Sequence, residues 1–193
     1  TTNNVPTRST FSPLLFKGTT FSTGGYSAEY GEALSSILVM NTIDEPDLEK
    51  TDLGFMSVGL SAGTIKKWKK DAFSINANYI NLAPYQALMP DNIHWIKPYE
   101  SIGGESVYRH SFDRGLFKFY ASFSGATFDV EQEDINFPNL LRNINNNTNF
   151  YTNSSYRGRF ASNWKVFAGL SYGYSHNKGS YDVIDYATSE NAI

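Results

Sequence analysis

The 193-residue sequence contains no cysteine, which excludes a disulfide framework and thiolate metal sites. It also lacks an excess of positive charge, because 16 Lys and Arg stand against 19 Asp and Glu for a formal net charge of −3. A nucleic-acid partner would require clustered basic residues, so this balance argues against one. No apolar run approaches the roughly 20 residues of a membrane-spanning helix, and the longest promising run covers only residues 37–40.

Catalytic motifs are missing as well. His94, His110 and His176 are widely separated, and none stands in a metal-ligand spacing. No G-x-S-x-G elbow accompanies the many serines, and the acidic residues at 131–134 lack the order of a calcium loop. We therefore expect no enzyme, no metal and no cofactor.

What the sequence does contain is aromatic residues, at 16%, and a clear alternation of apolar and polar positions. A period of two is typical of β-strands, and no segment shows a convincing helical stripe. The fold class predicted is therefore all-β with antiparallel strands. Strands are expected near residues 56–62, 73–79, 104–112, 117–123, 154–162 and 165–174.

The expected connections between these strands differ in length. Short ones are predicted at residues 63–70, 113–115 and 163, and long ones at residues 81–103 and 127–152. Soluble sandwiches usually have short turns throughout, whereas transmembrane barrels have short turns at one rim and long loops at the other. One face of the strands is rich in Phe and Tyr, and the other in Ser, Asn, Gly and Tyr. Lipid outside and a wet lumen inside would produce this pattern, although an ordinary buried core is the alternative.

Residues 1–50 have a different texture, rich in Thr, Ser and Gly, and end in an acidic, proline-containing stretch at 44–47 that predicts a linker. Within them, residues 21–42 read FSTGGYSAEYGEALSSILVMNT. This string resembles the end of the plug domain in TonB-dependent outer-membrane receptors, in the version found in Bacteroidetes. The motif residues singled out are Gly24, Gly25, Glu29, Tyr30, Gly31 and Ala33. The string departs from the family pattern at Ser36, where many members have Gly, and at residues 40–41, where many have Ile-Val or Val-Thr.

The resemblance covers the first 42 residues by motif and the remainder only by architecture. It implies two parts: residues 1–50 as the end of the plug and its linker, and residues 51–193 as the first six or seven strands of the barrel. Such a barrel has about 22 strands, more than this chain can supply, so a fragment is expected. No signal peptide is recognised at the start. The first barrel strand is either hidden around residues 42–52 or followed by a short outer loop.

For function, the resemblance implies energy-coupled import of a scarce nutrient across the bacterial outer membrane. The implied partners are TonB with its inner-membrane energising complex, outer-membrane lipid and lipopolysaccharide, a surface lipoprotein, and the transported substrate. Residues 81–103 and 127–152 would be the first substrate-facing loops. The substrate class stays open among siderophores, cobalamin, oligosaccharides and peptides.

Several charged residues are candidates for ion pairs inside such a barrel: Glu29, Glu32, Glu105, Arg109, Arg157 and Arg159. The two last arginines share one face of a predicted strand and could pair with plug carboxylates or with substrate. The basic run at residues 66–70 would contact anionic lipid, or would form a charged hairpin turn that keeps a sheet edge soluble.

Two other functions remain open. The first is a small complete outer-membrane barrel of about eight strands with a structural or adhesive role, which fits the chain length. The second is a soluble β-sandwich that binds carbohydrate through its aromatic residues. Neither accounts for the plug-like string.

Overall fold

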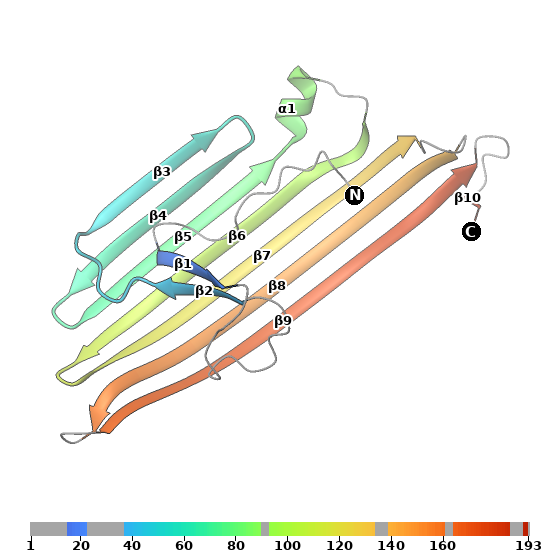
Figure 1. The fold of residues 1–193 in the computed structure, drawn as a ribbon. Coiled ribbons are helices and arrows are strands. Elements are labelled where there is room, and N and C mark those ends of the chain that lie inside the picture. The colour runs from blue at the N-terminus through green and yellow to red at the C-terminus, as the bar shows by residue number, and fades with distance from the viewer. Residues whose placement is uncertain are drawn as a thin grey trace.

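The computed structural model describes residues 15–22, 37–89, 93–133, 139–160, 164–185 and 191–192, and nearly all of them lie in antiparallel β-sheet. The prediction of an all-β fold is therefore confirmed. A two-stranded sheet pairs β1 (Phe16–Ser22) with β2 (Ile37–Thr42). An eight-stranded sheet has the order β10-β9-β8-β7-β6-β5-β4-β3, so strands adjacent in sequence are adjacent in space (Figure 1).

The strands of the large sheet lengthen along the chain from β3 to β9. Their bounds are β3 (Lys50–Met56), β4 (Gly59–Trp68), β5 (Asp71–Asn81), β6 (His94–Phe112), β7 (Gly115–Glu133), β8 (Asn139–Phe160), β9 (Trp164–Asp185) and β10 (Asn191–Ala192). The short strands β3 to β5 lie at one side of the sheet, and the long strands β6 to β9 run far beyond them (Figure 1).

Several predicted boundaries were wrong. The strand expected at 56–62 is interrupted by a hairpin turn at residues 57–58, because β3 ends at Met56 and β4 begins at Gly59. The short connection expected at 63–70 narrows to residues 69–70, since β4 continues to Trp68. The strand β3 overlaps the region 42–52, where a hidden first strand was one of two expectations, only at residues 50–52, and the turn after it is short.

The prediction of two long loops was also largely wrong. Residues 127–133 lie in β7 and residues 139–152 lie in β8, and the two strands pair without interruption from Glu133 and Leu140 to Gly115 and Gly158. Residues 134–138 lie outside the described part of the chain. The asparagine run at 143–147 has low intrinsic strand propensity, but pairing with neighbours on both sides overrides it. In the region 81–103, β6 already begins at His94, and a short helix α1 (Ala83–Leu88) precedes it.

Helix α1 starts at a proline in its first turn, where the missing N–H costs nothing. The Ala83 N–H donates to Asn81 Oδ1 at 2.8 Å, which fixes the exit from β5. No helix in the described part of the chain is long and apolar enough to span a membrane.

The large sheet has two chemically distinct faces. Paired residues in an antiparallel sheet point to the same side, so the register assigns each side chain to a face. We call the face that carries the β1–β2 hairpin the covered face and the opposite one the open face. The core is small and lies under the hairpin, where Leu15, Val107 and Tyr120 are buried.

Candidate functional site

The β1–β2 hairpin is held on the sheet by a small apolar contact. The rings of Phe16 and Tyr120 meet edge to face with centroids 5.8 Å apart, and Leu15 and Val107 are fully buried beside them. Edge-to-face aromatic pairs contribute on the order of 1 kcal/mol beyond the area they bury. This contact places the hairpin against β6 and β7, and Figure 1 shows its two short strands in front of the large sheet.

Polar contacts fix the chain where it leaves β2, at residues 42–44. The Asp44 carboxylate accepts from Lys118 Nζ at 3.0 Å and pairs with Arg157 Nη2 at 2.7 Å. Lys118 Nζ also donates to the Thr42 carbonyl at 3.3 Å. We call this arrangement, together with Arg109, the clasp.

Arg109 supplies the third cation of the clasp. Its Nε donates to the Ile43 carbonyl at 2.5 Å and its Nη1 to Ser74 Oγ at 2.8 Å. The side chain is only 2% exposed, yet Nη2 has no hydrogen-bond partner among the described residues. Three cations from three successive strands therefore hold three consecutive residues of the segment after β2.

The clasp shifts the acidity of Asp44. Burial alone raises the pKa of its carboxyl, but hydrogen bonds and charge from Lys118 and Arg157 lower it more, so the net pKa lies below its usual 3.8. The carboxylate is thus ionised throughout the physiological range. It serves as the shared anion between β7 and β8.

The structure places the predicted site residues as follows. Glu105 is 5% exposed and accepts from the Tyr120 hydroxyl at 2.8 Å, on the same face as Arg109. Arg157 pairs with Asp44, and Arg159 lines a cavity of about 710 Å³ with Arg114 and Lys165. Seven further residues lie outside the described part of the chain: Gly24, Gly25, Glu29, Tyr30, Gly31, Glu32 and Ala33.

Sequence reasoning missed Asp44 and Lys118. Asp44 lies in the stretch predicted to be a linker, and Lys118 was one of several alternating polar residues. The period of two would have placed Lys118 on one face with Tyr120, but no signal in the sequence linked it to Asp44. Lys118 stands on the same face of β7 as Tyr120, and Arg157 pairs with Leu116 on that face.

The basic run at 66–70 covers the end of β4 and the β4–β5 turn, and its charge is partly neutralised. Lys66 pairs with Glu49 at 3.4 Å and Lys70 with Asp113 at 2.7 Å. These pairs are exposed and contribute little stability each.

The open face carries a band of exposed apolar side chains. Large members include Ile102 and Phe112 on β6, Phe119 and Phe123 on β7, Phe150 and Phe160 on β8, and Trp164, Leu170 and Tyr174 on β9. Across the band on β6 to β9, no Asp, Glu, Lys or Arg stands on this face. Monomeric soluble proteins rarely expose an apolar patch of such extent.

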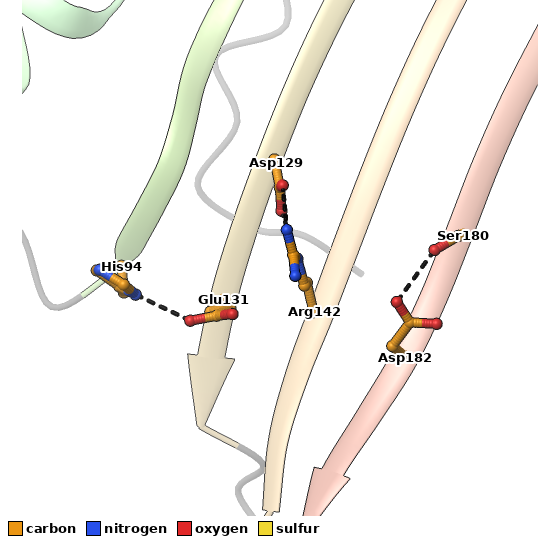
Figure 2. A network of polar contacts seen from close by, with 6 residues as sticks. All are labelled: His94, Asp129, Glu131, Arg142, Ser180 and Asp182. Atoms are coloured by element: carbon orange, nitrogen blue, oxygen red, sulfur yellow. Dashed lines mark hydrogen bonds and ion pairs between the residues drawn. The ribbon is translucent and has the colours of Figure 1, made fainter. Parts of the chain in front are cut away.

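On β6 to β9, charges appear on the open face only beyond the band, where four residues form a ladder across the four strands. On β4 and β5, Lys66 and Asp71 also stand on this face, near the short turns. His94, Glu131, Arg142 and Asp182 are consecutive register partners on β6, β7, β8 and β9. Figure 2 shows the His94–Glu131 contact at 2.9 Å and the two hydrogen bonds from Arg142 to Asp129, at 3.0 and 2.7 Å. Ser180 and Asp182 add a bond along β9. The ladder marks where the sheet leaves the apolar band.

Nothing in the described residues forms a group of His, Cys, Asp or Glu suited to a metal. Comparisons with protein-family models, curated proteins and solved structures gave no significant match.

Proposed function

We propose that these residues form part of a TonB-dependent outer-membrane transporter that imports a scarce nutrient. In this proposal β3 to β9 are the first strands of a transmembrane β-barrel, and the β1–β2 hairpin belongs to the end of its plug. The open face meets lipid, the covered face lines the lumen, and the protein makes and breaks no covalent bond.

The observation that carries the proposal is the constant height of the apolar band. It runs from Ile102 to Phe112 on β6, from Phe150 to Phe160 on β8, and from Trp164 to Tyr174 on β9. Each interval is about ten residue steps, or roughly 34 Å along a strand. At a tilt of about 45° this spans roughly 24 Å, against the ~25 Å apolar band of outer-membrane barrels.

The clasp would determine which part of the plug moves when force is applied to it. TonB, with its inner-membrane energising complex, would pull on a segment N-terminal to the hairpin and deform the plug. Residues 42–44 are tied to three strands by Arg109, Lys118 and Arg157. The pull would therefore displace the plug while its attachment to the barrel stays fixed.

The resemblance implies further partners, and the sheet offers a place for each. Outer-membrane lipid would cover the apolar band, and lipopolysaccharide would lie against the charged ladder above it. A surface lipoprotein would approach the rim formed by α1 and the far ends of β6 to β9. A small complete barrel fits less well, because β3 and β10 lie at opposite edges of the described sheet. A soluble sandwich fits less well because the apolar face is uncovered.

A matched pair of substitutions on β9 tests the proposal. Leu170 is 76% exposed near the middle of the band, and Ser171 is the next residue, on the covered face. In the complete gene product, Leu170→Lys places a charge in lipid at a cost of about 2–4 kcal/mol, whereas Ser171→Lys points into the lumen.

We expect Leu170→Lys to reduce the amount of heat-modifiable protein in outer-membrane fractions, with Ser171→Lys assembling normally. Equal assembly of both variants, or detergent-free solubility of the protein, would refute the barrel.

A further inference from the structure

A hollow of about 420 Å³ opens on the covered face beside the hairpin core. It lies between that core and a second aromatic cluster, in which Trp95 and Tyr99 pack against Phe128 with ring centroids 6.5 and 6.3 Å apart. Its floor is made of small residues from β6 and β7: Ser101, Gly103, Ser122, Ser124 and Ala126. The hollow exists because these positions carry almost no side chain.

Gly103 is the centre of this floor. A Cβ built there would stand 2.5 Å from Asn78 Oδ1, which leans across it from β5. Register places Ser124 on its other side. Glycine at this position therefore leaves room in the hollow while the Asn78 amide stays within reach.

Amide and hydroxyl groups line two sides of the hollow, and the aliphatic side chains of Val58, Ile80 and Leu82 complete its lining. Asn78 stands on one side, and Asn147 and Asn149 on the other. Asn149 donates to Ser124 Oγ at 3.4 Å and accepts from Ser175 Oγ at 2.7 Å, so these side chains are held in place by one another. Amides and hydroxyls can both donate and accept, which matches a ligand whose hydroxyls also do both.

The charge of the residues that line the hollow disfavours an anionic ligand. Glu105 is the one charged residue among the described residues that line the hollow, and it is bonded to Tyr120. No lysine or arginine in the described chain lines it. An anionic ligand would lose hydration here without gaining a cation. At the far end, the Tyr99 ring offers an apolar surface for the C–H face of a sugar ring.

We infer that this hollow binds a neutral, hydroxyl-rich ligand of the oligosaccharide class. The inference rests on the proposed function and narrows its substrate to uncharged sugars. The cavity that Arg114, Arg159 and Lys165 line near the short turns is chemically opposite, so the covered face changes from cationic to neutral along the strands.

Binding by the purified complete gene product in detergent tests the inference. The probes are an array of neutral linear and branched oligosaccharides, and a ferric tricatecholate complex as an anion of comparable size. Asn149→Ala removes a wall group, and Ser124→Trp fills the hollow. Asn153→Ala is the matched control, because it lies on the same strand and face but does not line the hollow.

We expect at least one neutral oligosaccharide to bind. Asn149→Ala should weaken that binding about tenfold, Ser124→Trp should abolish it, and Asn153→Ala should change it less than twofold. The inference would be overturned if no neutral oligosaccharide in the array bound, or if Asn149→Ala and Ser124→Trp left oligosaccharide binding unchanged.

Energised uptake of the ferric anion with no sugar binding would overturn the ligand class but leave the transporter standing. The two Lys substitutions on β9 report on assembly without any ligand, so failure of the proposed function is seen separately.

Discussion

Replacing Asp44 by Asn should loosen the hairpin without unfolding the sheet. The substitution keeps the shape of the side chain but removes the charge shared by Lys118 and Arg157. The Lys118 side chain is 18% exposed, so its charge-assisted bond is worth about 1.5 kcal/mol. The Arg157 side chain is 55% exposed, and its pair adds only about 0.5 kcal/mol. The loss is therefore about 2 kcal/mol.

Hydrogen exchange of the complete gene product in detergent can measure this loss. Local opening of the β1–β2 hairpin would become about 30-fold more frequent, since each 1.4 kcal/mol is a factor of ten. The Ile43 N–H, which donates to the Leu15 carbonyl at 2.9 Å, is a suitable reporter. Asp52→Asn is the matched control, because Asp52 pairs with Lys50 at 2.9 Å in an exposed position.

The effect should depend on pH in a defined direction. Because the folded-state pKa of Asp44 is lowered, its contribution is present above the unfolded value of 3.8 and is lost as the pH falls through the lower folded pKa. Wild type and Asp44→Asn should therefore differ at pH 7 and converge in strong acid. Equal exchange of the two at pH 7, or an equal effect of Asp52→Asn, would refute the clasp.

Two further predictions concern the sheet itself. Gly59→Ala should destabilise the sheet by about 1–3 kcal/mol, because the new Cβ would stand 2.2 Å from the Tyr79 carbonyl oxygen. Gly104→Ala should be tolerated, because the atom nearest to its new Cβ is 3.6 Å away. The temperature at which the gel mobility of each variant shifts measures both effects. Arg142→Gln should speed hydrogen exchange at the ends of β7 and β8, since it leaves the carboxylates of Asp129 and Glu131 without their shared cation. Arg142→Lys should restore the slow exchange only in part, because the paired bonds to Asp129 are lost. Unchanged melting of Gly59→Ala, or full rescue by Lys, would contradict the respective argument.

The sequence predicts the strand content well and the strand ends poorly. Alternation identifies 117–123 and 165–174, because one face there is apolar. Beyond Phe123 the apolar positions of β7 change phase to Ala126, Phe128 and Val130, and beyond Tyr174 most positions on both faces of β9 are polar. The simple pattern therefore fades while the strands continue to Glu133 and Asp185. Pairing with neighbouring strands extends them, and a short stretch of sequence gives no information about that pairing.

The clasp escaped prediction for a related reason. Asp44 and Lys118 are 74 residues apart, and only the placement of the hairpin brings them together. The faces of Arg109 and Arg157 could be predicted from period two, since parity is a local property. Their partners could not.

The unbroken pairing of β7, β8 and β9 has a consequence for how this sequence can vary. No bulge interrupts the 22 residue pairs that join β8 to β9, so nothing along them can absorb a change in phase. Inserting a single residue within β8 would exchange the two sides of every position beyond it, sending asparagines outward and phenylalanines inward. Length changes in these strands should therefore be tolerated only in steps of two, or at the turns. That rule can be tested by scanning one- and two-residue insertions through β8.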